Sequence, residues 1–140
     1  MNKKVLIVSA NYYKDISDAL NIGATDFLKR NNIDYEIIES PGSFEIPYII
    51  NQNLKFFDGF IALGCVIRGE TYHFEIISNE CARKIMDLSI SSNKPVGFGI
   101  LTCDNMKQAI KRADPKKKDK GGDAAEAVSS VLSIVEHESK

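Results

Sequence analysis

The sequence is poor in the residues that build metal centres, disulfide frameworks and membrane spans. Its 140 residues include no tryptophan, three cysteines and two histidines. Cys65, Cys81 and Cys103 are widely spaced and form no Cys-x-x-Cys pair, so we expect reduced thiols and no metal site. Apolar runs such as Val5–Val8 fall far short of the ~20 residues of a membrane span, and the basic start lacks the apolar core of a secretory signal. These absences favour a cytoplasmic protein without a membrane partner.

An excess of one charge is also lacking. Lys and Arg number 18 and Asp and Glu number 19, which gives a net charge of −1. A general nucleic-acid binder normally carries a basic excess, so this balance argues against that class. Apolar residues make up 44% of the chain and charged residues 26%, whereas a disordered chain would be less apolar. The length suits one hydrophobic core, and we predict a single domain over residues 1–140.

Apolar runs and turn signals alternate along the chain. Short β-branched runs predict four strands, at 3–10, 34–39, 60–67 and 96–101. Helical spacing predicts five helices: one ending near 31, one at 44–53, one at 74–88, one capped by Asp104, and one at 124–138 after a charged loop at 114–123. Strands that alternate with helices indicate a parallel sheet with right-handed crossovers, covered on both faces. The predicted fold class is therefore α/β, a three-layer sandwich around a four-stranded parallel sheet.

Ligands of such sheets bind at the carboxyl ends of the strands, which here precede the loops 11–14, 40–45, 65–73 and 102–105. The first loop has no glycine, which argues against a dinucleotide-binding fold. It also carries Asn11 where a phosphoacceptor domain would have acidic residues. Neither of these two common α/β classes is therefore predicted.

The loop with the sequence CVIRGETYH, residues 65–73, carries the strongest chemical signal. Its backbone N–H groups at 69–71 precede a helix, and a helix N-terminus favours anions, phosphate above all. Thr71 adds a hydroxyl, or merely caps the helix. His73 falls in the first helical turn, where the helix dipole disfavours the protonated imidazole. A neutral histidine suits proton transfer, although a helix-start residue without catalytic role is the alternative.

Two cations could serve the same anion. Arg112 follows Gln108 by one helical turn, and Lys120 precedes a pair of glycines, although either residue could be an ordinary surface cation. The chain shows no paired catalytic carboxylates. Cys65 is interpreted as strand-end packing, because no His and Asp pattern would activate it. The residues alone predict a site for a phosphorylated small molecule with acid–base chemistry.

Three segments then resemble one known family. They are PGSFEIP at 41–47, GCVIRGETYHFE at 64–75, and 95–113 together with Lys120-Gly121. This set is similar to the 6,7-dimethyl-8-ribityllumazine synthases of riboflavin biosynthesis. The resemblance implies a flavodoxin-like strand order and a transferase that needs no metal or organic cofactor. The reaction would condense 5-amino-6-ribitylaminouracil with 3,4-dihydroxy-2-butanone 4-phosphate, with release of phosphate and water.

The resemblance also implies roles for individual residues. His73 corresponds to the histidine that moves protons. The positions that would bind the aminouracil come from four segments: Tyr12, Ser43, Phe44, Glu45, Cys65, Val66, Ile67 and Phe98. The positions that would bind the butanone phosphate are Glu70, Thr71, Arg112 and Lys120. Tyr13 departs from the family pattern, which usually has Asn there, and Tyr12 stands where Phe or Trp is more usual.

The family resemblance implies a homo-oligomer built on pentamers, with each site shared between neighbouring subunits. Phe98, Arg112 and Lys120 would then come from the neighbour. The sequence leaves open whether the assembly is a pentamer, a decamer or a 60-subunit shell.

Three other functions also stay open: an archaeal-type riboflavin synthase, a non-catalytic flavin- or lumazine-binding protein, and a structural shell protein. The complete IRGETYH motif together with Arg112 favours the synthase.

Overall fold

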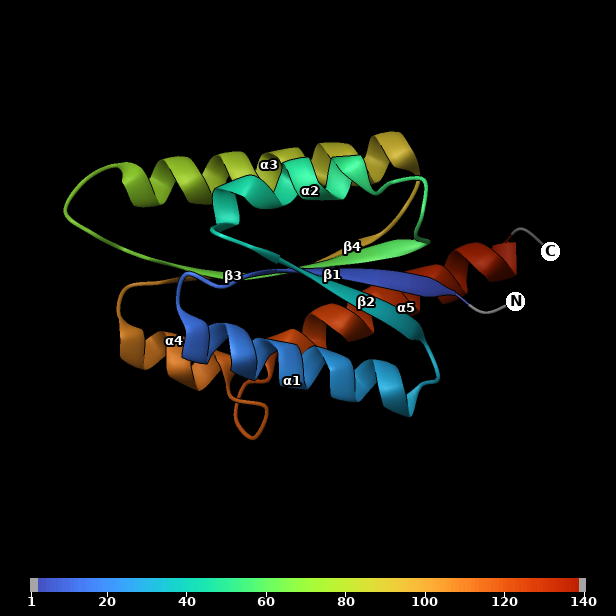
Figure 1. Cartoon of the computed structure of the whole chain (residues 1–140), viewed down its shortest axis with the longest axis horizontal. Coiled ribbons are helices and arrows are strands. Elements are labelled where there is room, and N and C mark those ends of the chain that lie inside the picture. The colour runs from blue at the N-terminus through green and yellow to red at the C-terminus, as the bar shows by residue number, and fades with distance from the viewer. Residues whose placement is uncertain (1–2, 139–140) are drawn as a thin grey trace.

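The computed structural model describes residues 3–138, with the backbone alone at 137 and 138. Strands and helices alternate along the chain (Figure 1). The elements are β1 (Lys4–Ala10), α1 (Lys14–Arg30), β2 (Asp34–Ser40), the 3-10 turn η1 (Ser43–Glu45), α2 (Ile46–Gln52), β3 (Gly59–Ile67), α3 (His73–Ser92), β4 (Val96–Cys103), α4 (Met106–Ala113) and α5 (Lys120–Glu138). Within the described residues, no helix is long and apolar enough to cross a membrane.

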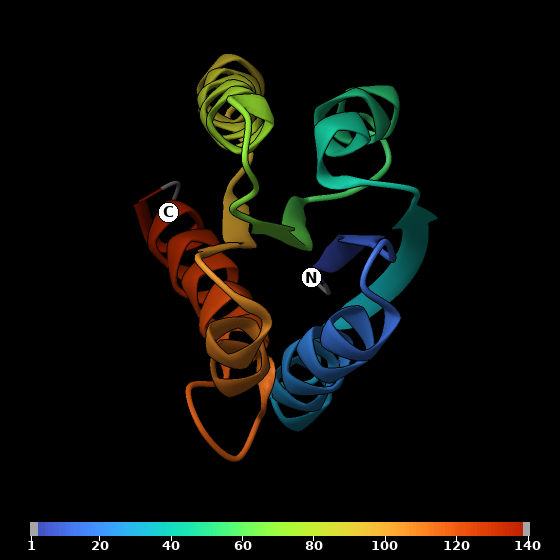
Figure 2. The same ribbon diagram turned by 90° about the vertical axis from the view of Figure 1, so that its left-hand side faces the viewer.

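The four strands form one parallel sheet in the order β2-β1-β3-β4. Helices α2 and α3 cover one face, and α1, α4 and α5 cover the other, as Figure 2 shows in a view onto the carboxyl ends of the strands. This arrangement confirms the predicted three-layer sandwich and its four parallel strands. The strand order is also the flavodoxin-like one that the family resemblance implied.

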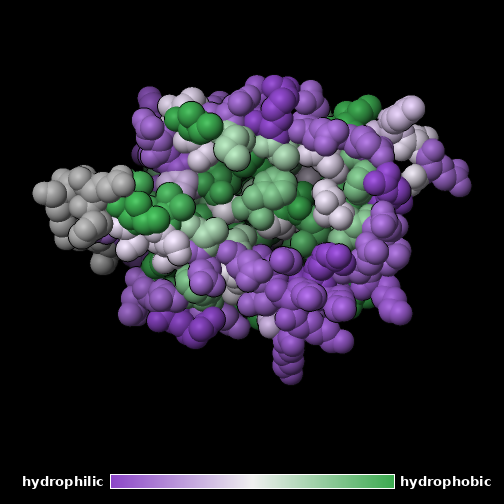
Figure 3. All heavy atoms as spheres, turned by 180° about the vertical axis from the view of Figure 1, so that it is seen from behind, coloured by the Kyte–Doolittle hydropathy of each residue, from purple (hydrophilic) through white to green (hydrophobic). Residues whose placement is uncertain are grey.

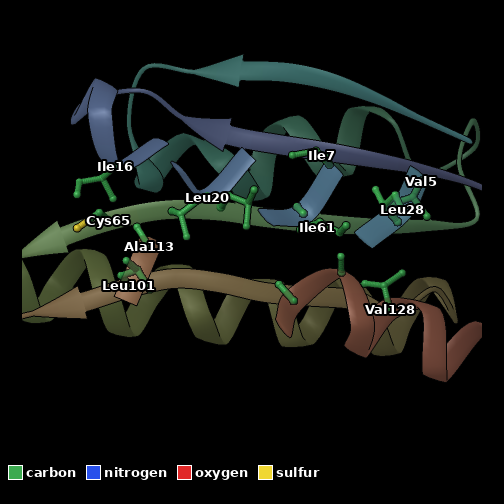
Figure 4. Packing of buried hydrophobic residues seen from close by; sticks show 14 of the residues in the cluster. Val5, Ile7, Ile16, Leu20, Leu28, Ile61, Cys65, Leu101, Ala113 and Val128 are labelled. Carbon is green, nitrogen blue, oxygen red and sulfur yellow. The ribbon is translucent and has the colours of Figure 1, made fainter. Parts of the chain in front are cut away.

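Hydrophobic side chains fill the space on both sides of the sheet. Successive residues of β1 alternate between the two sides, so that Val5 and Ile7 face α1 and α5 while Leu6 and Val8 face α2 and α3. In the first cluster, Leu20 of α1, Ile61 of β3 and Val128 of α5 are fully or almost fully buried (Figure 4). Burying such a side chain stabilises the fold by about 1.5–3 kcal/mol. Because both faces are covered, β1 and β3 are almost continuously apolar.

Two predicted helix starts are wrong in detail. Asn105, not Asp104, caps α4, because its Oδ1 accepts the Gln108 N–H at 2.9 Å. Asp104 instead donates its backbone N–H to the side-chain oxygen of Gln108, at 2.8 Å. Residues 44–53 are also not one α-helix, since the 3-10 turn Ser43–Glu45 precedes α2.

The last helix begins at Lys120, four residues earlier than predicted. Asp119 starts it, accepting the Gly122 N–H with its carboxylate at 3.2 Å and the Asp123 N–H with its carbonyl at 3.0 Å. The glycines that suggested a loop serve close packing instead. A Cβ at Gly121 would lie 2.1 Å from the carbonyl oxygen of Leu20, so α1 and α5 approach each other too closely for a side chain there.

Candidate active site

A cavity of about 670 Å³ opens at the carboxyl end of β1 and β3. Its lining includes eight of the residues predicted from the sequence: Tyr12, Ser43, Phe44, Glu45, Cys65, Val66, Ile67 and His73. They come from the loop after β1, the 3-10 turn, the end of β3 and the start of α3. The fold thus gathers segments more than 60 residues apart around one hollow, at the edge of the sheet where α/β proteins bind ligands.

Ser43 lines this cavity and carries a buried, unpaired hydroxyl. Its residue is 6% exposed, and its Oγ has no hydrogen-bond partner among the described residues. Gly64 of β3 makes room for it, because a Cβ at Gly64 would lie 2.6 Å from the Ser43 oxygen. A buried hydroxyl without a partner costs about 1–3 kcal/mol. Because this oxygen is itself buried beside Gly64, its missing partner is a cost to the fold and not a polar atom displayed to the cavity.

The two tyrosines after β1 form one wall of the cavity. Tyr12 is 75% exposed, and Tyr13 is partly buried. Burial raises the pKa of the Tyr13 phenol above its ordinary value, and the neighbouring Tyr12 and Cys65 raise it further. Tyr13 is thus a neutral hydroxyl at physiological pH. Sequence reasoning noticed Tyr13 only as a departure from a pattern and did not assign it to the site.

His73 is the first residue of α3 and lies exposed at the cavity rim. Its backbone N–H points to the Thr71 hydroxyl at 3.4 Å. Tyr72, not Thr71, is the residue that precedes α3 as its N-cap, and no side chain caps it. Glu70 and Thr71 are exposed and do not line the cavity. Ile76 and Ile77 line it from the next turn of α3; their spacing from His73 is the signal that would have found them.

Three predicted site residues lie away from this cavity. Phe98 is on β4 and is 45% exposed. Arg112 is partly buried on α4, where its Nη1 lies 3.4 Å from the Gln108 carbonyl oxygen, and it forms no ion pair with any described carboxylate. Lys120 pairs with Asp123 at 3.5 Å. Arg112 and Lys120 belong to helices on the sheet face opposite α3 (Figure 1).

The cysteine thiols near the site are neutral. Burial raises the pKa of Cys65 to about 12, with a smaller contribution from Cys103. Cys81 donates its Sγ–H to the Ser43 carbonyl at 3.2 Å, and burial raises its pKa to about 11. A thiol that stays protonated is a poor nucleophile. This agrees with the interpretation of Cys65 as a packing residue.

Taken together, the parallel sheet and the cavity at its carboxyl edge define an α/β protein with a pocket of the size of a small molecule. A family model described as 6,7-dimethyl-8-ribityllumazine synthase matches residues 2–136. The chain belongs to the 6,7-dimethyl-8-ribityllumazine synthase family, which confirms the resemblance noted in the sequence.

Similar proteins that carry the name 6,7-dimethyl-8-ribityllumazine synthase match almost the whole chain. One from Bartonella tribocorum is 48% identical over 139 residues, which cover 96% of this chain and 92% of the relative. One from Bartonella henselae is 48% identical over 134 residues, covering 93% and 86%. One from Agrobacterium fabrum is 46% identical over 137 residues and covers 93% of each chain.

Proposed function

We propose that this chain condenses 5-amino-6-ribitylaminouracil with 3,4-dihydroxy-2-butanone 4-phosphate to 6,7-dimethyl-8-ribityllumazine, releasing phosphate and water. The chain is a transferase of riboflavin biosynthesis by its family. The observation that carries the proposal is the family match over residues 2–136, combined with one cavity that gathers most of the residues expected to bind the aminouracil.

The cavity suits a flat, polar heterocycle with a polyol chain. Tyr12 and Phe44 provide exposed aromatic faces, and base–aromatic stacking holds a pyrimidine ring. The Glu45 carboxylate provides a partner for hydroxyl and N–H groups. The aminouracil amine would attack the ketone carbon, water would leave to give an imine, phosphate would leave, and ring closure would release the last water.

His73 is the group that would move protons in these steps. The amine loses protons as the imine forms, and the departing hydroxyl gains one, so an imidazole at the cavity rim can serve both transfers. The backbone N–H groups at the start of α3, with Glu70 and Thr71, would hold the phosphate nearby. Binding both substrates beside each other also accelerates the reaction by proximity.

The phosphate needs a cation that this cavity does not supply. Its lining contains no lysine or arginine among the described residues. Arg112, in contrast, is partly buried and has no carboxylate partner among the described side chains. We infer that a neighbouring subunit brings Arg112, with Phe98 and Lys120, to each cavity. The assembly would be a homo-oligomer built on five-membered rings.

The face around β4 fits this assembly. β4 is an edge strand, and from behind the molecule shows an apolar area surrounded by hydrophilic side chains (Figure 3). β4 and the helices beside it expose large apolar side chains: Phe98, Met86, Ile90, Val131 and Ile134. Apolar patches of this kind mark protein interfaces.

We further propose one domain over residues 1–140, because both hydrophobic clusters share the single sheet. We also propose a cytoplasmic location, because the three cysteines are free thiols.

The test is an assay of the purified protein with both substrates and no added metal. We expect the lumazine and one equivalent of phosphate to form. Lumazine formed only after a divalent ion is added, and abolished by a chelator, would contradict the proposal. Consumption of two lumazines without use of the butanone phosphate would instead identify a riboflavin synthase. Binding of the lumazine without any turnover would indicate a binding protein.

The shared site has its own test. In a ring mixed from His73→Ala and Arg112→Ala subunits, some sites receive neither substitution and others receive both. Co-refolding the two variants should therefore give more activity than either variant alone. Mass measurement must confirm that the subunits have exchanged. Exchange without a gain in activity would show that both residues act in one chain's pocket.

A further inference from the structure

Arg68 directly follows the cavity-lining Ile67 and makes three side-chain contacts. Its Nε donates to Asp104 Oδ1 at 3.1 Å, and its Nη1 donates to Glu75 Oε1 at 2.5 Å. The guanidinium also lies over the Phe74 ring, 4.5 Å from its centroid. These contacts use two edges of the guanidinium and one of its faces at the same time, which is a combination particular to arginine.

The partners lie on both sides of one loop. Arg68 directly follows β3, and Phe74 and Glu75 belong to the first turn of α3, so one side chain joins the start and the end of the loop 69–72. The backbone N–H of Arg68 donates to the Cys103 carbonyl at 2.9 Å, which ties the same point to the end of β4. The loop itself is exposed, and a Cβ at Gly69 would meet no atom within 4 Å.

We propose that Arg68 is a positioning residue for the condensation. It fixes the first turn of α3 against the carboxyl ends of β3 and β4, and thereby fixes His73 and the backbone N–H groups of the loop 69–72. It is not itself a phosphate ligand, because two carboxylates already face its charge. This role rests on the proposed function of His73 and of that loop.

An effect on catalysis without a large effect on folding is expected. Arg68, Glu75 and Asp104 are 50%, 39% and 65% exposed, and exposed ion pairs contribute little to stability. Catalysis is far more sensitive, since a displacement of reacting groups by about 1 Å can cost up to a hundredfold in rate. Removing the Arg68 side chain should therefore make the loop 69–72 more mobile while the rest of the fold stays intact.

The experiment compares Arg68→Ala with Arg83→Ala in the assembled enzyme. Arg83 is a matched control, because it lies on α3, is 59% exposed and pairs with Glu80 at 3.0 Å. For Arg68→Ala we expect kcat to fall by about tenfold or more and KM for the butanone phosphate to rise, with KM for the aminouracil nearly unchanged. Arg83→Ala should keep the wild-type values. Arg68→Lys should recover little of the loss, since an ammonium cannot bind both carboxylates and stack on Phe74.

Hydrogen exchange supplies a readout that does not depend on activity. Amides of residues 69–74 should exchange faster in Arg68→Ala than in the wild type, while those of β1 and β3 should not change. Glu75→Gln and Asp104→Asn should each give a smaller change than Arg68→Ala. Adding Glu75→Gln to Arg68→Ala should cause little further loss, because both act on one contact.

The outcomes separate the two proposals. Wild-type kinetics in Arg68→Ala, or unchanged exchange of residues 69–74, would overturn the positioning role. So would an equal loss for both substrates accompanied by a lower melting temperature, which would indicate a general structural role. If the wild-type protein itself lacks condensation activity, the proposed function fails, whereas the exchange data still decide whether Arg68 orders the loop.

Discussion

The ring of Tyr13 stands edge-on to the ring of Tyr12, with centroids 4.9 Å apart and planes at 87°. Edge-to-face pairs of this kind are worth about 0.5–1.5 kcal/mol beyond the area that they bury. The partly buried Tyr13 thus holds the exposed Tyr12 at the wall of the cavity. The pair explains how an exposed ring can be available to a ligand without being free to turn away.

Tyr12→Ala should raise KM for the aminouracil. Stacking of one base on an aromatic ring contributes about 1–3 kcal/mol, which corresponds to roughly five- to 150-fold. Tyr12→Phe keeps the ring and should stay close to the wild type. Steady-state kinetics with each substrate varied in turn measure the effect. An equal increase in KM for both substrates would show that Tyr12 does not stack on the pyrimidine.

Arg112→Ala should raise KM for the butanone phosphate far more than KM for the aminouracil. A charge-assisted hydrogen bond to phosphate is worth about 1.5–3 kcal/mol, or ten- to a hundredfold in affinity. Lys111→Ala, which removes an exposed cation from the neighbouring position, is the control and should have no such effect. Equal changes for the two substrates in Arg112→Ala would exclude a phosphate contact.

His73→Ala should slow turnover without abolishing it. One positioned acid–base group contributes about a hundred- to ten-thousandfold, whereas proximity of the bound amine and ketone remains. Single-turnover measurements with saturating substrates separate this loss from weaker binding. Wild-type turnover in the variant would reduce His73 to a residue that merely begins α3.

Gly121→Ala should destabilise the fold by about 1–3 kcal/mol, although alanine is the better helix former. The added Cβ would lie 2.1 Å from the Leu20 carbonyl oxygen and would push α1 and α5 apart. Gly69→Ala is the control, since no atom lies within 4 Å of a Cβ there. Urea unfolding of both variants gives the comparison. Equal stability of Gly121→Ala and the wild type would contradict the close helix contact.

Asp119→Asn should stabilise the protein increasingly as the pH rises. Burial raises the pKa of the Asp119 carboxyl above its ordinary value of 3.8, an effect that the Gly122 N–H partly offsets. The folded state therefore holds the proton more tightly than the unfolded state, and wild-type stability falls as the pH rises through this range. Asn stays neutral, still accepts the Gly122 N–H and tolerates the left-handed backbone, where φ is 47°.

Urea unfolding of Asp119→Asn and the wild type across a pH series measures this difference. The difference in the free energy of unfolding between the variant and the wild type should begin to grow near pH 3.8. It should level off once the folded-state carboxyl is ionised. A difference that does not depend on pH, or that shrinks with rising pH, would show that the carboxylate is not destabilised in the folded state.

The sequence was most informative where burial is complete. β1 and β3 are buried on both faces, so their apolar runs could be found without knowledge of their neighbours. The start of α5 was missed because Gly121 and Gly122 have the composition of a loop, and only the contact with Leu20 reveals their role. A close approach between two helices leaves no periodic signal in either one.

The site was predictable in part for a similar reason. The loops at the carboxyl ends of β1, β2 and β3 follow from the order of the elements, and eight residues that the family resemblance implied at these strand ends do line one cavity. The role of Arg68 was not visible, because its partner Asp104 lies 36 residues away and an arginine before a glycine resembles any solvated loop cation. Under the shared-site proposal, the contribution of Arg112 depends on a second subunit, and a single chain would not display it.

His73 and Arg112 lie on opposite faces of the sheet, and this placement has a consequence for the activity of an unassembled subunit. Under the shared-site proposal, a freshly folded chain has the pocket and the histidine but is catalytically inactive until a neighbouring subunit associates with it. Its activity per chain then depends on protein concentration, since dilution below the dissociation constant of the ring removes the cation from every site. The assembly equilibrium would act as an on-switch for the enzyme, with no further molecule needed to control it.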